Sequence, residues 1–535
     1  MDFDWNNPYP TVRTPVFARN LVSTSHPLAS QAGVRMLLKG GSAVDAAVAA
    51  AAVLTIVEPV SNGLGSDCFA IVADQDGLSG LNASGHSPRT WNADYFRKKY
   101  GETPPQRGWD SVTVPGAVAG WVALSQRYGK LAFADLLEPA IEIAERGHAV
   151  AAIVARKWQA QIETLAGQPG FAAAFMPHGR APRPGEKFVF PEAGKTLRSI
   201  ALTRGRSFYE GEIAKALAEH SLDNGGSMAE ADLADFRPEW VKPIEKDYAG
   251  YTVHEIPPNG QGIAALMALG ILSHLHIEDH PLDSVESQHL QIEAMKLAFA
   301  DVYHWVADAS AMTEVTGAHL LDDAYLAERA RQINPDRAQS FGHGRPPAGG
   351  TVYLTAADER GMMISFIQSN YMGFGSGIVV PGTGVSLQNR GYGFSHAAEH
   401  PNRVAPRKRP FHTIIPAFLT RKGRPQMSFG VMGGNMQPQG HLQTLVRMLN
   451  YRQQPQAACD APRWKFNRGL SLDCEATMPV AVVEALRARG HVIETIPDSY
   501  MDFGSGQFIW KLSEDPDHGY VAASDSRRDG QAAGF

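Results

Sequence analysis

The sequence predicts an α+β fold, because helix-type and strand-type patterns are concentrated in different parts of the chain. Residues 27–57 and 93–245 carry apolar residues mostly at helical spacing, whereas alternating segments typical of strands follow residue 350. Between these parts, "GHGRPPAGG" at 342–350 has the composition of a linker, since proline cannot donate to a ladder and glycine adopts unusual dihedral angles. We therefore divide the chain into a helix-rich part, 1–350, and a strand-rich part, 351–535.

The helix-rich part begins with two predicted helices within residues 27–57, separated by "KGGSA" at Lys39–Ala43. A glycine-rich turn, "SNGLGSD", then leads into two short strands joined at Asp76-Gly77. Further along, "YAGYTVHEIPPNGQG" predicts a strand and a loop, and "IAALMALGILSHL" predicts the helix that follows. The stretch "SVESQHLQIEAMKLAFADVYHWVAD" has apolar residues at helical spacing and predicts another helix.

The strand-rich part contains four segments with the alternation or β-branched content of strands. They are "TVYLTAAD", "GMMISFIQ", "FHTIIPAFLT" and "PQMSFGVMGG". No internal repeat is visible, so the two parts are expected to combine in one folded unit rather than in an array.

Composition narrows the class of protein. The chain has 535 residues, 44% hydrophobic and 19% charged, as in soluble globular proteins, and its net charge of −6 argues against a nucleic-acid partner. The three cysteines, Cys68, Cys459 and Cys474, form no CxxC pair, which fits a reducing compartment. The most apolar stretch has 12 uncharged residues between Asp45 and Glu58, whereas a membrane span needs about 20. With an acidic, proline-broken start, the expectation is a cytoplasmic protein without a membrane partner.

The junction "PPAGGTVYLTAADERG" (346–361) permits two interpretations of Thr351. In the first, Gly350 ends a turn and Thr351 begins an ordinary strand. In the second, the flexible glycines let the Thr351 hydroxyl attack the carbonyl of Gly350. The chain is then cut before Thr351, whose released α-amine, with a pKa near about 7.7–8, acts as the general base for its own hydroxyl.

The order of motifs along the chain favours the second interpretation. The stretches "GGSAVDAAVAAAAVLTIVEPVSNGLG", "SVTVPGAVAGWVALSQRYGKL", "MAEADLADFRPEWVKP", "YAGYTVHEIPPNGQG", "IEAMKLAFAD", "TVYLTAADERG", "GFGSG", "PRKRPFHTIIPAF", "VMGGN" and "AASDSRRDGQAAGF" occur in this order. Together they resemble the γ-glutamyltransferase family of N-terminal-nucleophile hydrolases, over nearly all of the chain. The resemblance implies a four-layer αββα sandwich and a precursor cut between Gly350 and Thr351 into a large and a small subunit.

The resemblance also implies roles for residues around Thr351. An acyl-enzyme would form on its hydroxyl and be resolved by water or by an amine acceptor. Gly433 and Gly434 of "VMGGN" match the glycine pair whose amides form the oxyanion hole, where each donor contributes about 2.7–4 kcal/mol. Ser369 matches a hydroxyl residue beside the nucleophile; a plain strand serine is the alternative, as a simple turn is for the glycines.

The resemblance fails at the positions that hold a γ-glutamyl group. Family members with that activity pair the donor's carboxylate with an arginine and its ammonium with an aspartate; the matching positions here are Ser84 in "LNASGHSPR" and Gly393 in "NRGYGFS". Other pocket positions differ as well, and the candidates for substrate binding are Tyr371, Arg390, His412, Thr413, Ser84 and Arg89. Arg390 and Arg89 suit a carboxylate, which arginine binds with two parallel hydrogen bonds; each is alternatively a structural charge.

We therefore predict a self-processing amidohydrolase or acyltransferase with weak γ-glutamyl activity, acting on a small-molecule amide. Candidate substrates are oxamate-like or cephalosporin-type amides, or glutathione. A catalytically silent member kept for binding or assembly is the alternative. No metal or other cofactor is expected: "HAAEH" (396–400) has a zinc-site spacing, but that site needs a helix and Pro401 follows. The two subunits of one precursor are expected to stay together, with further oligomerisation left open.

Overall fold

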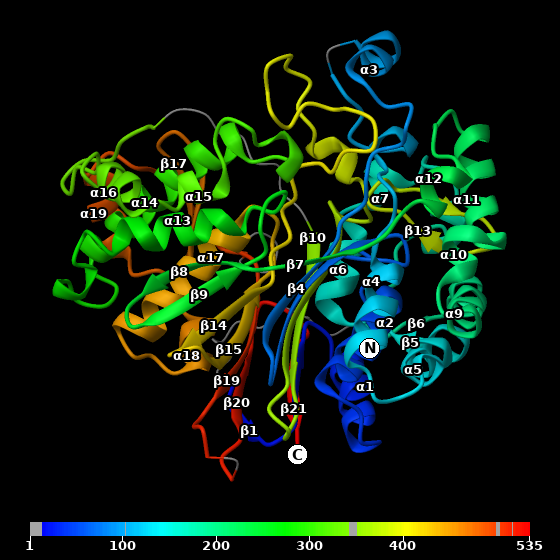
Figure 1. Cartoon of the computed structure of the whole chain (residues 1–535), viewed down its shortest axis with the longest axis horizontal. Coiled ribbons are helices and arrows are strands. Elements are labelled where there is room, and N and C mark those ends of the chain that lie inside the picture. Colours follow the sequence, from blue (N-terminus) through cyan, green and yellow to red (C-terminus); the bar gives the residue numbers. More distant parts are fainter. Residues whose placement is uncertain (1–12, 102, 342–349, 499–502, 516) are drawn as a thin grey trace.

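A computed structural model describes residues 13–101, 103–341, 350–498, 503–515 and 517–535. Figure 1 shows these residues as four layers, in which two β-sheets lie face to face and helices cover the outer face of each. The predicted αββα sandwich is thereby confirmed. The predicted linker falls, except for Gly350, outside the described residues.

The first sheet contains strands from both sides of residue 350. Its order is β21 (Gln531–Gly534), β2 (Leu21–Thr24), β10 (Gly350–Ala357), β11 (Met363–Tyr371), β3 (Asp67–Asp74), β4 (Gly77–Ala83) and β7 (Glu239–Val241). β10 pairs antiparallel with β2 and β11, and β11 pairs antiparallel with β3. The strand that begins at the predicted cleavage point is therefore central in the sheet.

The second sheet is also assembled from distant segments. Its order is β1 (Val16–Ala18), β20 (Tyr520–Ser524), β19 (Gly506–Lys511), β15 (Arg424–Val431), β14 (Ala417–Arg421), β9 (Tyr251–Glu255) and β8 (Ile244–Tyr248). Each neighbouring pair is antiparallel. Neither of the two large sheets is formed by the part before residue 350 alone or by the part after it alone.

Apolar side chains fill the space between the sheets and beneath both helical layers. Phe69 and Ile367 of the first sheet and Phe418 and Ile509 of the second belong to one buried cluster. A larger cluster joins the first sheet to its helices, and another joins the second sheet to helices on the opposite side. This burial is the dominant favourable contribution to folding, at about 25 cal/mol per Å² of apolar surface.

Two helices cover the first sheet next to β10. They are α1 (Pro27–Leu38) and α2 (Ala43–Val57), separated at the predicted "KGGSA" break. Ser42 caps α2: its Oγ accepts from Asp45 N, while Asp45 accepts from Ser42 N. Every residue of α2 is buried, as predicted for this apolar stretch. Within the described residues, no helix has both the length and the apolar character to cross a membrane.

The other helices that precede β7 lie between residues 93 and 234. They are α3 (Ala93–Tyr100), α4 (Ala117–Tyr128), α5 (Phe133–Arg146), α6 (Ala152–Gln159), α7 (Ile162–Leu165), α8 (Phe171–Phe175), α9 (Pro191–Thr203), α10 (Arg206–Glu210), α11 (Glu212–Asp223) and α12 (Glu230–Ala234). The second helical layer contains α13 (Gly262–Leu272), α14 (Val285–Trp305), α15 (Gly317–Leu320), α16 (Asp323–Ala330), α17 (Met436–Leu445), α18 (Pro455–Asp460) and α19 (Val480–Ala488).

The small sheets consist of β5 (His148–Ala149) with β6 (Lys187–Phe188), β12 (Val379–Val380) with β13 (Val385–Ser386), and β16 (Trp464–Arg468), β17 (Ser471–Glu475) and β18 (Val492–Ile496).

One predicted strand is wrong over its first half. The segment "FHTIIPAFLT" forms a strand only from Ala417, where β14 begins. Before that point the backbone bonds elsewhere: His412 N donates to Asn259 O, and Ile415 N donates to the Gln437 side chain. Pro416 has no N–H to continue a ladder. His412 and Thr413 thus lie in an irregular segment before β14 rather than in the strand.

Candidate active site

Thr351 lies at the start of β10, in the middle of the first sheet. Gly350 is paired with Tyr371 of β11, and the register shifts between Gly350 and Val352. Across this shift, Thr351 alone lies opposite Ser369 and Asn370, so the extra residue of the bulge is in β11 and Thr351 faces it. Only 1% of Thr351 is exposed. The residue predicted to be the nucleophile is thus held in an irregular, buried backbone position directly after the predicted cleavage bond.

The Thr351 hydroxyl lies between two polar side chains. Its Oγ1 is 3.3 Å from Ser369 Oγ and 3.4 Å from Gln437 Nε2. Ser369 Oγ also accepts from Tyr371 N at 2.8 Å, and Gln437 Oε1 accepts from Ile415 N at 2.9 Å. Both neighbours are fixed by the backbone, so the hydroxyl has a defined position. Ser369 lies where the sequence predicted it; Gln437 was missed, although it follows "VMGGN" closely.

Gly433 and Gly434 lie just before α17, in a backbone form that favours glycine. Their φ angles are 117° and 60°. Gln261 Nε2 fixes this turn by donating to Gly434 O at 2.9 Å and to Thr413 O at 2.6 Å. Within the described part of the chain, neither glycine N–H donates a hydrogen bond. Two unpaired amides at a helix N-terminus form a suitable cradle for a developing oxyanion.

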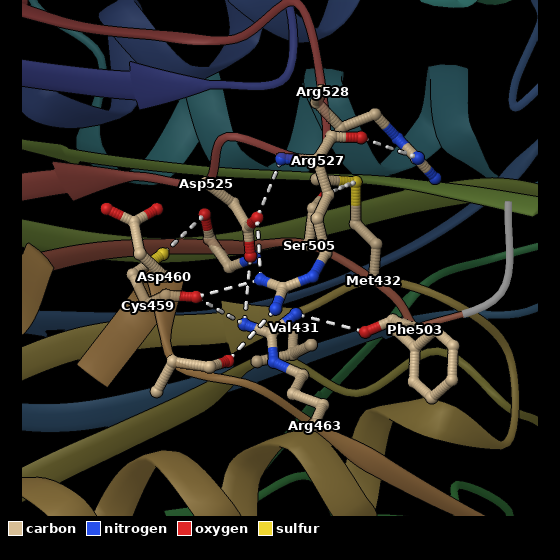
Figure 2. A network of polar contacts seen from close by, with 12 residues as sticks. Val431, Met432, Cys459, Asp460, Arg463, Phe503, Ser505, Asp525, Arg527 and Arg528 are labelled. Carbon is tan, nitrogen blue, oxygen red and sulfur yellow. Dashed lines mark hydrogen bonds and ion pairs between the residues drawn. The ribbon is translucent and has the colours of Figure 1, made fainter. Parts of the chain in front are cut away.

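A buried polar network surrounds Asp525 and Arg463, as Figure 2 shows, and reaches Met432, the residue before the glycine turn. Asp525 Oδ2 accepts from Gly506 N at 2.7 Å and from Arg463 Nη2 at 2.8 Å. Ser505 O in turn accepts from Met432 N at 2.8 Å, immediately before Gly433. The network connects the chain near residue 505 to the backbone that carries the two amides, and so helps to fix their direction.

The C-terminal "DSRRDG" motif supplies part of this network. Arg527 donates to both carboxylate oxygens of Glu475 at 2.6 Å and to Asp525 Oδ1 at 3.1 Å. Burial alone would raise the pKa of Asp525, but Arg463 and Arg527 lower it to about 2. The motif is therefore a buried ion-pair network rather than an exposed charged turn.

Arg390 is a buried cation next to two other predicted pocket residues, Tyr371 and Thr413. It begins the short 3₁₀ turn η4 (Arg390–Gly393) and is 1% exposed. Its Nη1 donates to Thr413 Oγ1 at 2.6 Å, and its guanidinium lies 4.5 Å from the centre of the Tyr371 ring. Burial lowers the pKa of Arg390 to about 10, so the side chain remains charged at neutral pH. The structure thus brings three predicted pocket residues together.

His412 forms a buried pair with Asp67, a residue that the sequence analysis missed. His412 Nε2 lies 2.9 Å from Asp67 Oδ2, and both side chains are fully buried. Because Nδ1 accepts from Ile414 N, we assign the proton to Nε2. Asp67 is paired with Ser369 across strands β3 and β11. An aspartate that precedes a run of apolar residues in a strand was the available signal in the sequence.

Burial raises the pKa of Asp67 from 3.8 to about 7, despite the attraction of Arg390. The native state therefore binds a proton that the unfolded state releases, and stability is lost as the pH rises from about 4 to 7. Asp67→Asn keeps an oxygen for His412 but cannot ionise. The free energy of unfolding of this variant minus that of the parent should therefore be about 2–3 kcal/mol higher at pH 8 than at pH 5. Urea unfolding of the uncut Thr351→Ala chain with and without the change measures this difference.

Asp525→Asn is the matched control for that measurement. The pKa of Asp525 is held at about 2, so this carboxyl is ionised at both pH values and its replacement should cost the same stability at each. If the effect of Asp67→Asn is equally independent of pH, Asp67 does not have a raised pKa.

A cavity of about 580 Å³ opens beside these residues. Two lining residues relate this cavity to Thr351 and the glycine turn: Tyr371 is paired with Gly350, and Asn435 directly follows Gly434. The lining consists of Pro104, Tyr303, Val306, Tyr371, Tyr392, Gly393, Phe394, Ser395, His396, His400, Asn402, Phe411, Thr413 and Asn435. This mixture of aromatic and polar groups suits a small organic substrate.

Gly393 lines this cavity at the position where the family resemblance implied an aspartate. A Cβ atom placed on Gly393 would lie 2.8 Å from Phe411 O, a backbone atom. Gly393 O also accepts from Asn402 Nδ2 at 2.7 Å, which fixes the two segments together. The local backbone therefore has no room for a larger residue unless it shifts.

Of the six substrate-binding candidates, only Tyr371 and Thr413 line this cavity; Ser84, Arg89, Arg390 and His412 do not. Ser84 is fully buried and donates to Asn82 Oδ1 at 2.7 Å, while its carbonyl accepts from Arg409. Arg89 lines a separate cavity of about 150 Å³ and forms ion pairs with Asp232 and Asp235. The carboxylates paired with Arg89 already neutralise it, so Arg390 is the better candidate for an anionic substrate group.

The structure places one set of possible metal ligands together among the described residues: His289, Glu293 and His491. His289 Nδ1 lies 2.9 Å from His491 Nε2, and Lys296 Nζ lies 2.6 Å from Glu293 Oε1 and 3.4 Å from His491 Nδ1. The ammonium group of Lys296 already supplies a cation to this set. The "HAAEH" segment forms a turn rather than a helix. That no metal is required stays a prediction.

This chain is similar to known proteins over nearly its whole length. A family model described as gamma-glutamyltranspeptidase matches residues 29–535. The "glutathione hydrolase-like YwrD proenzyme" of Bacillus subtilis is 37% identical over 533 residues, covering 98% of this chain and all of that one. The "oxamate amidohydrolase proenzyme" of Klebsiella pneumoniae is 34% identical, covering 97% and 99%. A crystal structure of cephalosporin acylase from Bacillus halodurans has a TM-score of 0.94 at 45% identity, covering 100% and 99%.

Proposed function

Since this chain belongs to the gamma-glutamyltranspeptidase family of hydrolases, we propose that it is a self-processing amide hydrolase with Thr351 as its nucleophile. One observation carries the proposal. The Thr351 hydroxyl is buried opposite a bulge of β11, beside Ser369 and Gln437 and directly after the Gly350 carbonyl. Relatives named as proenzymes support a precursor that is cut into two subunits.

The first reaction is the cut itself. Thr351 Oγ1 attacks the Gly350 carbonyl carbon, the peptide C–N bond breaks, and the hydroxyl proton passes to the nitrogen. The product is an ester between Gly350 and Thr351. Water then hydrolyses this ester, leaving a carboxylate on Gly350 and a free α-amine and hydroxyl on Thr351. Ser369 is well placed to orient Oγ1 for the first step, because its own oxygen is fixed by Tyr371 N.

The mature site then uses the same hydroxyl on an external amide. The α-amine of Thr351 accepts the Oγ1 proton, and the oxygen attacks the substrate carbonyl. The amides of Gly433 and Gly434 stabilise the negative oxygen that develops. The protonated α-amine donates its proton to the leaving amine, and an acyl ester remains on Thr351. Water, or an acceptor amine, releases the acyl group in the second half of the cycle.

The acyl pocket differs from one that holds a γ-glutamyl group. The two positions that would pair with its carboxylate and ammonium are Ser84 and Gly393, which carry no charge. Ser84 is buried away from the cavity, and Gly393 has backbone within 2.8 Å of where a Cβ would lie. Because charged hydrogen bonds contribute about 1.5–3 kcal/mol each, we propose that γ-glutamyl turnover is weak.

Two matched anilides test this part of the proposal. Glutaryl-p-nitroanilide and γ-glutamyl-p-nitroanilide differ only by the α-ammonium group. An unpaired ammonium loses hydration on entering the site, so kcat/KM should be at least about 10-fold lower for the γ-glutamyl compound. Release of p-nitroaniline measures both. Efficient turnover of the γ-glutamyl compound would show that the interpretation of Ser84 and Gly393 is wrong.

A further inference from the structure

A second cavity, of about 750 Å³, lies on the second sheet and shares no lining residue with the active-site cavity. Its strand residues include Tyr251 of β9, Arg421 of β14 and Trp510 of β19. We propose that this cavity is a binding site for a planar aromatic molecule that carries a carboxylate. The volume lies within the range of about 300–1,000 Å³ that is typical of small-molecule sites.

The location of this cavity separates it from the reacting groups. Arg421 is paired with Arg424, where β15 begins, and β15 ends at Val431, just before the glycine turn. The seven residue steps from Arg424 to Val431 span about 23 Å, at about 3.3 Å per residue. A small molecule bound beside Arg421 therefore does not reach the glycine turn, so the proposed ligand is not the amide that is cut.

Aromatic and apolar side chains of the lining suit a flat ring. The Trp510 ring lies 5.9 Å from the Tyr251 ring at an interplanar angle of 61°, and the guanidinium carbon of Arg421 lies 5.3 Å from the centre of the Tyr251 ring. Met448 and Val521 also line the cavity and are 7% and 5% exposed. A planar ring gains edge and offset contacts with the two aromatic side chains and covers the apolar ones.

The charge of the lining points to an anion. Arg421 and Arg452 line the cavity, and none of its described lining residues is acidic, although the whole chain has a net charge of −6. Among the residues that the structure describes, neither of these guanidinium groups has a carboxylate partner, whereas the nearby Arg424 is paired with Glu514 at 3.5 Å. An arginine binds a carboxylate with two parallel hydrogen bonds.

The backbone that carries Arg452 is fixed by its neighbour. Gln453 N donates to Arg447 O at 3.0 Å, and Gln453 Oε1 accepts from Arg447 Nη1 at 3.1 Å. This segment follows η5 (Val446–Asn450), a π-helical turn that continues α17, and such turns occur frequently at functional sites. A cation on a fixed backbone has less freedom to lose when it binds a ligand.

Isothermal titration calorimetry with 2-naphthoate tests this inference. One molecule per chain should bind to the wild-type protein with a Kd of about 0.1 mM or lower. 2-Naphthol keeps the rings without the carboxylate, and propanoate keeps the carboxylate without the rings, so each should bind at least about 10-fold more weakly. Absence of 2-naphthoate binding, or equal affinity for 2-naphthol, would overturn the inference.

Variants locate the bound molecule. Trp510→Ala should raise the Kd for 2-naphthoate by at least about 10-fold, as should the double change Arg421→Gln with Arg452→Gln. The two arginines are exposed, so the double variant tests the site even if Trp510→Ala fails to fold. Arg424→Gln, outside the lining, and His396→Ala, in the active-site cavity, are the matched controls and should keep the Kd within about 2-fold. Unchanged binding by the double variant, or a loss confined to His396→Ala, would show that the ligand binds elsewhere.

A second copy of this chain is the competing occupant, because Phe17 and Leu512 of the lining are 64% and 44% exposed. Sedimentation velocity distinguishes the two. The proposed site requires that the affinity for 2-naphthoate be independent of protein concentration and be the same for the uncut Thr351→Ala chain. A dimer that Trp510→Ala dissociates, and that binds no 2-naphthoate, would contradict it.

Discussion

Thr351→Ala should give a single uncut chain whose amide turnover is reduced by at least about 10⁴-fold, because the change removes the nucleophile of both reactions. The wild-type protein should instead separate on a denaturing gel into fragments of roughly 38 and 20 kDa, sized by chain length. Release of p-nitroaniline from glutaryl-p-nitroanilide measures turnover in parallel. The expected effect is large because the released α-amine is lost together with the hydroxyl.

Thr351→Ser is the matched variant for this experiment. It keeps the hydroxyl and the position of the α-amine, so it should still cut itself and still turn over, at lower rates. Fragments of unchanged size from Thr351→Ala would show that another residue performs the cleavage. A wild-type chain that stays uncut and inactive would instead favour the alternative of a silent member with a binding or assembly role.

Gly433→Ala should lower kcat by about 10²-fold or more, since one oxyanion donor contributes about 2.7–4 kcal/mol. The φ angle of 117° is unfavourable for alanine, and a Cβ would lie 3.0 Å from Gly504 Cα. Both effects rotate the amide away from the position in which it faces the substrate. Single-turnover kinetics on the processed enzyme measure the chemical step directly.

Gly423→Ala separates this effect from simple backbone strain. Gly423 also has a positive φ, 76°, but a Cβ there meets nothing within 4 Å. The variant should lose a comparable amount of backbone stability and keep wild-type kcat. If Gly433→Ala also keeps kcat within about threefold while remaining folded, the glycine turn does not form the oxyanion hole.

Local patterns in the sequence predicted many of the elements around the site. The "KGGSA" break between α1 and α2 and the Asp76-Gly77 turn between β3 and β4 lie where they were predicted. Such features depend on nearby residues: glycine conformation, helix capping and hydrophobic spacing. The four-layer arrangement followed from the family resemblance, since the pairing of β10 with β2 joins residues more than 300 positions apart and no local rule specifies it.

The polar interior of the site was only partly predictable for the same reason. Asp67, Gln261 and Gln437 act through partners distant in sequence, so their roles appear only when the segments are brought together. The segment of His412 and Thr413 was predicted as strand, yet it bonds to loops and side chains. Arg390 was recognised as a candidate cation, but its one-sided pairing is a property of the folded structure.

The most direct test of the central claim is mass spectrometry of enzyme quenched with acid during turnover of glutaryl-p-nitroanilide. The account predicts a small fragment that begins with Thr351 and carries one glutaryl group, which peptide mapping places on that residue. Turnover by a chain that remains uncut, or a glutaryl group on any other residue, would contradict it.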